Sequence, residues 1–129
     1  NVRLVHTTSV SEMFEQVIRV TQDDLVIGIS FPRYSKRTVK ALQFASDRGA
    51  TVLAITDSRL SPLAANAKYT LIAKSDMASF VDSLVAPLSV INALIVAIGM
   101  KKQKEIADTF NNLEHIWEEY QVYEKTDNE

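Results

Sequence analysis

The sequence predicts an α/β fold in which a parallel sheet is flanked by helices. Short apolar runs of strand length alternate with amphipathic stretches of helix length through the first half of the chain. This alternation is typical of parallel sheets, whose strands are joined by crossover helices. The 129 residues are enough for one domain with its own hydrophobic core, and no internal repeat or linker is evident.

The first predicted elements are a short strand, a helix and a second strand. Residues 2–6 are rich in β-formers and predict a strand. The helix is indicated by apolar residues at helical spacing, and either Ser9 or Ser11 is suited to cap it. Residues 25–29 form a continuous apolar run, as in a parallel strand covered on both faces. The apolar helical positions are Val10, Met13, Phe14, Val17 and Ile18.

Two further strands and a helix complete the predicted sheet. A polar loop over residues 30–35 leads into a helix predicted over 36–48, and Gly49 follows in the position of a helix C-cap. Residues 51–56 predict another buried strand and residues 69–73 the last one, with a short helix between them.

The last third of the sequence is helical in pattern. Residues 84–98 are apolar nearly all round, which indicates a helix buried within the domain or against a partner chain, ending at Gly99. This run of fifteen residues contains Pro87 and is shorter than the roughly 20 that a bilayer requires. A final helix carries an apolar seam at Ile106, Phe110, Leu113, Trp117 and Tyr120.

Composition and charge exclude several classes of function. A net charge of -2 provides no general positive surface for nucleic acid. The absence of cysteine excludes disulfides and thiolate chemistry, and fits a cytoplasmic location, as does the lack of a secretory signal at the first residues. His6 and His115 have no partners at metal-ligand spacing, so neither a metal nor a cofactor is expected.

The loop between residues 30 and 38 is the strongest candidate for a ligand site. In parallel sheets ligands bind beyond the carboxyl ends of the strands, where loops run into helix N-termini. Ser30, Ser35 and Thr38 place hydroxyl groups there, which together with backbone N–H groups suit an anion. Helix capping is the alternative reading of these three residues. Residues 56–58 either border the same pocket or form only a turn.

Three stretches resemble the sugar isomerase (SIS) domain. They are residues 24–30 (DLVIGIS), 49–57 (GATVLAITD) and 61–64 (SPLA). Within that superfamily the chain resembles the effector domains of RpiR-type transcription regulators, and the block over residues 82–88 is similar to a regulator rather than an enzyme. The resemblance implies a three-layer, flavodoxin-like α/β/α fold with its ligand at the serine-rich loop.

The resemblance also implies which residues hold the ligand. In the family a phosphosugar phosphate is held by hydroxyls that correspond here to Ser30, Ser35 and Thr38. The family loop, Ser-x-Ser-Gly-x-Thr, is shorter, and Lys36 stands at its glycine position. Three basic residues add positive charge for a phosphate, namely Arg33, Lys36 and Arg37.

The resemblance covers almost the whole chain and sets the expected domain. We expect a sugar-phosphate-binding SIS domain over residues 1–125, followed by a polar tail at 126–129. The family's first β–α unit has no counterpart in this sequence, so an N-terminally incomplete sheet is expected.

The resulting functional hypothesis is a phosphosugar-sensing effector and oligomerisation domain of a bacterial transcription regulator. Its expected partners are a sugar phosphate and further copies of itself, with DNA bound only through a helix-turn-helix domain absent from this chain. The alternative is an aldose–ketose phosphosugar isomerase, with Asp76 or a glutamate from a neighbouring chain as base. A third possibility is a fragment that only oligomerises.

Overall fold

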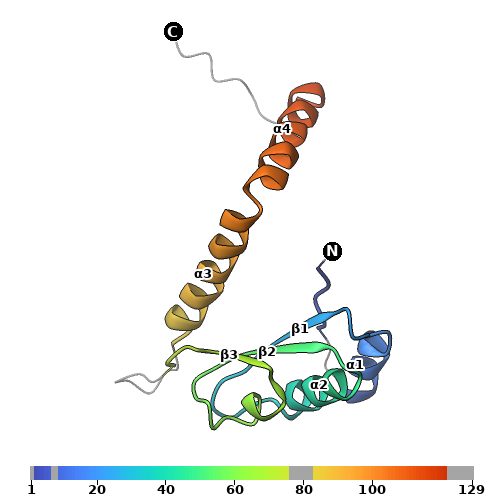
Figure 1. The fold of residues 1–129 in the computed structure, drawn as a ribbon, viewed down its shortest axis with the longest axis vertical. Helices are drawn as coiled ribbons and strands as arrows, with labels where there is room; N and C mark the ends of the chain where they lie inside the picture. The colour runs from blue at the N-terminus through green and yellow to red at the C-terminus, as the bar shows by residue number, and fades with distance from the viewer. Residues whose placement is uncertain (1, 7–8, 76–82, 122–129) are drawn as a thin grey trace. The chain divides into compact units, whose positions relative to one another are not determined.

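The computed structural model describes residues 2–6, 9–75 and 83–121 (Figure 1). The chain forms two compact units, residues 1–90 and 91–129. The first unit contains the sheet and the helices packed on it, and the second contains helical segments from the last third of the chain.

The sheet has three described strands, all parallel, in the order β1-β2-β3. These are β1 (Leu25–Ile29), β2 (Thr51–Thr56) and β3 (Tyr69–Ile72). Leu25 pairs with Thr51, and the register continues to the carboxyl ends of both strands. The predicted parallel α/β sheet is therefore confirmed, and the apolar runs mark its first two strands with the correct bounds.

Two helices lie on the same face of this sheet (Figure 1). Helix α2 (Lys36–Asp47) packs on β1 and β2, and α1 (Val10–Val17) packs against α2. The rings of Phe14 and Phe44 join the two helices, with 5.4 Å between their centroids. Gly49 follows α2 with a φ of 81°, the left-handed conformation that suits glycine after a helix, so the predicted C-cap is confirmed.

The core lies between α2 and the sheet. Alternate residues of a strand point to opposite faces, so one side of β1 and β2 meets α2 while the other turns away. The buried cluster on the helical side consists of Leu42, Ala45, Ala50, Val52, Ala54 and Leu63. On the opposite face Leu25, Ile27 and Ile29 are 57%, 43% and 46% exposed. The prediction that β1 is covered on both faces is therefore wrong for the described residues.

The predicted strand at residues 2–6 is also wrong. These residues have no strand conformation, and the side chains of Val2 and Leu4 are almost fully exposed. A β-rich composition makes a strand only where a neighbouring strand supplies hydrogen-bond partners, and among the described residues this segment has none.

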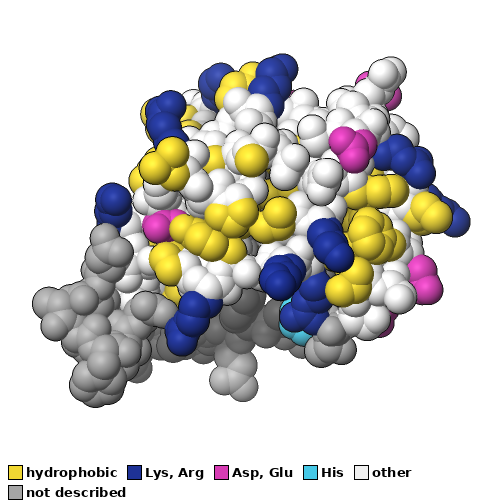
Figure 2. All heavy atoms as spheres, turned by 90° about the horizontal axis from the view of Figure 1, so that it is seen from below, with side chains coloured by type: hydrophobic (Ala, Val, Ile, Leu, Met, Phe, Trp, Pro, Cys, Tyr) yellow, Lys and Arg dark blue, Asp and Glu magenta, His cyan; other side chains and the backbone are white. Residues whose placement is uncertain are grey.

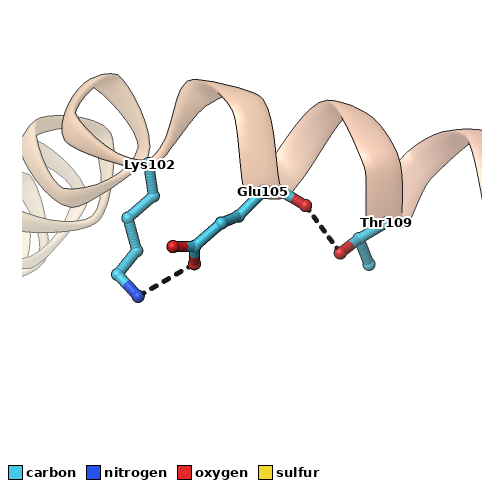
Figure 3. A network of polar contacts seen from close by, with 3 residues as sticks. All are labelled: Lys102, Glu105 and Thr109. Carbon is cyan, nitrogen blue, oxygen red and sulfur yellow. Dashed lines mark hydrogen bonds and ion pairs between the residues drawn. The ribbon is translucent and has the colours of Figure 1, made fainter.

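Two helices follow the sheet. Helix α3 (Val85–Lys101) runs through Gly99, so the expectation that the glycine ends the helix is wrong. The helix ends two residues later, and α4 (Gln103–Glu119) follows after Lys102. At this junction Lys102 Nζ lies 3.0 Å from Glu105 Oε2, while the Thr109 hydroxyl donates to the Glu105 carbonyl at 2.8 Å (Figure 3).

For helix α3 the sequence predicts burial either within the domain or against a partner chain; the first of these is wrong, and the second stays a prediction. Although apolar nearly all round, α3 is not buried in this chain, and Pro87 is its one buried residue. Exposed large apolar side chains in or next to it are Leu84, Val85, Leu88, Ile95, Val96, Ile98 and Met100. Within the described residues no single helix has the length and apolar character to cross a membrane. Helices α3 and α4 pass that test only as a pair, which is bent by 94°.

Candidate functional site

The candidate site lies where β1 and β2 end at the same edge of the sheet. The backbone N–H of Ser30 donates to the carbonyl of Ile55 at 3.2 Å and so extends the pairing of the two strands by one residue. The loop that begins at Ser30 therefore starts beside the end of β2. It closes at Ser35, where α2 begins.

The two serines of this loop are linked through its backbone. The Ser35 N–H donates to Ser30 Oγ at 3.0 Å, and the Thr38 N–H donates to Ser35 Oγ at 3.3 Å. Ser35 is thus the N-cap of α2, as one of the two readings of the sequence predicts. Each serine oxygen accepts a main-chain hydrogen, so each hydroxyl keeps its own hydrogen as a donor. Such donors at a helix N-terminus suit an anionic oxygen.

A tyrosine between the two serines ties the loop to the end of β2. The Tyr34 hydroxyl donates to Asp57 Oδ1 at 2.7 Å, and the Thr56 hydroxyl lies 3.3 Å from the same oxygen. The aromatic ring of Tyr34 packs against the core. This hydrogen bond to a carboxylate raises the pKa of the Tyr34 hydroxyl, and desolvation and the negative charge of Asp57 raise it further.

The basic residues of the loop flank this hydrogen-bonded centre. Arg33 is exposed and has a φ of 66°, a left-handed conformation that is uncommon for a residue with a side chain. Lys36 is exposed at the first position of α2, and Arg37 is half-buried beside it. Seen from the side of α2, Lys and Arg side chains are spread among hydrophobic ones rather than gathered in one patch (Figure 2).

The loop after β2 begins with Asp57 and is mainly structural. Ser58 Oγ accepts from the Leu60 N–H at 3.1 Å, and buried Ser61 accepts from the Ala64 N–H at 3.4 Å, at the start of the short helix η1 (Ala64–Asn66). The turn reading of Ser58 fits these contacts. Asp57 instead accepts hydrogen bonds from Tyr34, in the loop between β1 and α2, and from Thr56.

Six predicted ligand residues therefore share one short segment, and three of them form a hydrogen-bonded chain. These six are Ser30, Arg33, Ser35, Lys36, Arg37 and Thr38. The sequence indicates Asp57 only as a residue that borders the pocket or forms a turn, and it does not single out Tyr34. The one sequence signal for Tyr34 is that it is an aromatic residue inside a polar loop. Its partner, Asp57, lies 23 positions further along the chain.

Two further expectations concern a catalytic base and a metal site. Asp76, the candidate base of the isomerase alternative, lies outside the described residues. Within the described ranges, no group of three or more His, Asp or Glu residues is placed to hold a metal ion. The expectation that this domain acts without a metal stays a prediction.

A parallel sheet with helices packed on it and a hydroxyl-rich loop at the carboxyl ends of its strands defines a parallel α/β domain. Comparison with protein-family models identifies it further, because residues 1–97 match the SIS domain. The chain belongs to the SIS domain family.

Its relatives include transcription regulators. An uncharacterized HTH-type transcriptional regulator from Caldanaerobacter subterraneus subsp. tengcongensis is 30% identical over 103 residues, which are 77% of this chain and 36% of the relative. An uncharacterized HTH-type transcriptional regulator from Haemophilus influenzae is 30% identical over 99 residues, 74% of this chain and 34% of the relative. The chain thus spans about a third of the length of these curated relatives.

A solved structure is similar in fold over most of the chain. The sugar isomerase domain of an RpiR transcription factor from Sphaerobacter thermophilus superposes with a TM-score of 0.76 and 27% identity, covering 88% of this chain and 62% of the other. A crystal structure of a hypothetical protein gives a TM-score of 0.56 with 26% identity, covering 66% of this chain and 52% of the other. The predicted resemblance to an RpiR-type SIS domain is confirmed.

Proposed function

We propose that this chain is the phosphosugar-binding effector domain of a cytoplasmic bacterial transcription regulator, and that it binds its ligand without converting it. The observation that carries the proposal is the pair of hydroxyls at Ser30 and Ser35, joined through the Ser35 N–H at the N-terminus of α2. The loop that carries both serines runs from the end of β1 to the start of α2, and in parallel sheets ligands bind beyond the carboxyl ends of the strands.

The phosphate is proposed to bind at this loop through neutral and charged donors together. The serine hydroxyls and the hydroxyl of Thr38 supply hydrogen bonds, and the N-terminus of α2 supplies the positive end of its dipole. Lys36, at the first position of α2, adds a full positive charge close to the same end.

The regulatory part of the proposal comes from the relatives. Two of them are HTH-type transcriptional regulators of which this chain spans about a third, so DNA contact is assigned to a helix-turn-helix region outside the 129 residues. The ligand acts by favouring one arrangement of the intact protein over another. This requires different affinities for the two arrangements, and tight binding alone shifts nothing.

Self-association is the second part of the proposed role. Helix α3 exposes large apolar side chains along its length, among them Leu88 at 56% and Ile95 at 61%. Exposed apolar surface of this extent marks interaction sites in soluble proteins. We assign it to packing against a second copy, as the sequence analysis predicts for this segment.

A thermal-shift experiment tests the proposed ligand class. The chain is melted with sugar phosphates, with the corresponding free sugars and with inorganic phosphate. A ligand at about 100 times its dissociation constant stabilises by about 2.7 kcal/mol, which raises the Tm of a domain this size by several degrees. Ser30→Ala is expected to lose the ligand-induced shift, and Ser46→Ala, an exposed serine in the last turn of α2, is expected to keep it.

The same experiment separates the rival functions. If no sugar phosphate changes the melt while the chain remains self-associated, the oligomerisation-only hypothesis replaces the sensor. If a sugar phosphate binds and is converted to its isomer by the chain, the isomerase alternative is correct. Chromatography of the sugar phosphate after incubation with the protein measures that conversion.

A further inference from the structure

A carboxylate lies beside the proposed phosphate loop, where its charge opposes an anionic ligand. Asp57 Oδ1 accepts from the Tyr34 hydroxyl at 2.7 Å, and Tyr34 lies next to Ser35 in the chain. The other end of the loop reaches the same strand, because the Ser30 N–H donates to Ile55, two residues before Asp57. Both ends of the loop are therefore tied to the carboxyl end of β2, one to Ile55 in the strand and the other to Asp57 just after it.

The surroundings of Asp57 keep its carboxylate in one place. Both of its hydrogen bonds, from Tyr34 and from Thr56, end on Oδ1. The Thr56 side chain is fully buried, and the ring of Tyr34 packs against the core, so neither donor is free to swing away. A carboxylate has acceptor sites on both of its oxygens, and no hydrogen bond from the described residues reaches Oδ2.

A fixed carboxylate beside an anion site distinguishes between two kinds of phosphate. Inorganic phosphate carries its P–O–H hydrogens on the same group that the loop holds and has no hydroxyls beyond it, so a carboxylate beside the loop meets mainly its negative charge. A sugar phosphate presents neutral hydroxyls next to its phosphate, and these donate to a carboxylate. A site built to receive such donors discriminates strongly against a ligand that lacks them, because a polar group in the site is then left without its partner.

We propose that Asp57 is the residue by which this site selects a polyhydroxy phosphate ester over inorganic phosphate, with Tyr34 as the residue that positions its carboxylate. The inference rests on the proposed function and deepens it, since the phosphate is still held by the loop from Ser30 to Thr38. It gives Asp57 two effects of opposite sign, weakening the binding of inorganic phosphate and strengthening that of the sugar phosphate.

Titration calorimetry with glucose 6-phosphate, fructose 6-phosphate, ribose 5-phosphate and inorganic phosphate tests this. The measured quantity is the Kd of inorganic phosphate divided by the Kd of the tightest-binding sugar phosphate. In Asp57→Asn this ratio is expected to fall at least about tenfold, with inorganic phosphate binding more tightly than in the wild type. Tyr34→Phe, which removes only the hydroxyl, is expected to lower the ratio in the same direction by a smaller factor.

Asp47→Asn is the matched control, because Asp47 is an exposed aspartate in the last turn of α2 and loses the same charge away from the loop. Its ratio is expected to equal that of the wild type. An Asp57→Asn chain that keeps the wild-type ratio, or loses affinity for both ligands in parallel, overturns the role given to Asp57. If Asp57→Asn does not give a cooperative melt, the Tyr34→Phe ratio decides in its place. Failure of the wild-type chain to bind any of the sugar phosphates overturns the proposed function itself.

Discussion

The backbone of Gly28 lies directly against the side chain of Leu42. A Cβ placed on this glycine would be 2.5 Å from Leu42 Cδ1 and 2.8 Å from its Cγ, which no side chain tolerates without movement. Leu42 is 1% exposed and lies in the core cluster, so its neighbours restrict any such movement. This close approach brings α2 onto β1, and so fixes the loop that begins two residues after Gly28.

Gly28→Ala is expected to destabilise the chain by about 1–3 kcal/mol, because the added methyl group overpacks the contact with Leu42. Chemical denaturation monitored by circular dichroism measures the change. Combining it with Leu42→Ala, which alone costs about 2–5 kcal/mol, is expected to cost less than the sum of the two single substitutions. Strict additivity of the two would show that the methyl group and the leucine do not compete for the same space.

The cap of α2 gives a second prediction. Ser35→Ala removes the oxygen that accepts the Thr38 N–H, and the expected cost is about 1 kcal/mol in the free energy of unfolding. Ser35→Thr keeps a hydroxyl and is expected to recover most of it, and Ser46→Ala, at an exposed position, is expected to change stability little. Equal losses from Ser35→Ala and Ser46→Ala would contradict the capping role.

The bond between Tyr34 and Asp57 predicts a particular pH dependence at the alkaline end. The pKa of the Tyr34 hydroxyl is raised above its ordinary value of 10.0 by this bond. The bond's contribution to stability is therefore complete below the ordinary tyrosine pKa and is lost as the pH rises through the raised one.

Ultraviolet absorbance of the phenolate, recorded as the pH is raised, measures the ionisation of the four tyrosines of the chain. In the wild type a late phase is expected above the ordinary tyrosine pKa, from Tyr34. In Asp57→Asn that late phase is expected to move down toward the ordinary tyrosine pKa, and in Tyr34→Phe to disappear. A late phase that survives Tyr34→Phe belongs to another tyrosine and contradicts the assignment.

Hydropathy explains both what the sequence predicts correctly, the strands and the loop after β1, and what it does not predict, the surroundings of α3. β1 is apolar throughout and β2 is apolar between its two terminal threonines, and the polar residues after each strand mark the carboxyl end of the sheet, where Ser30 and Asp57 lie. Hydropathy indicates that an apolar surface is buried in the functional protein, but it does not indicate which segment or chain buries it. The apolar run over 84–98 therefore predicts a covered helix without saying whether the domain or a partner chain covers it, and within this chain α3 exposes much of its surface.

The contact between Tyr34 and Asp57 could not be predicted from the sequence, for a different reason. Each residue has an ordinary local role, in a polar loop and in a turn, and nothing in either neighbourhood identifies the other. Their hydrogen bond depends on the register of β1 against β2, which places Ile29 opposite Ile55. Residues that follow two paired strands meet only once that register is known.

The exposed surface of α3 leads to the last prediction, which concerns self-association. The chain is expected to be a dimer or larger oligomer in solution by light scattering after size-exclusion chromatography. Ile95→Glu, at a position 61% exposed, is expected to shift it toward monomer, because burying an isoleucine contributes about 2 kcal/mol and a two-fold interface carries the substitution twice. Asn112→Glu adds the same charge at an exposed position of α4 and is expected to leave the oligomer unchanged. A monomeric wild-type chain, or equal dissociation by both variants, would show that α3 is not the surface through which copies of this chain associate.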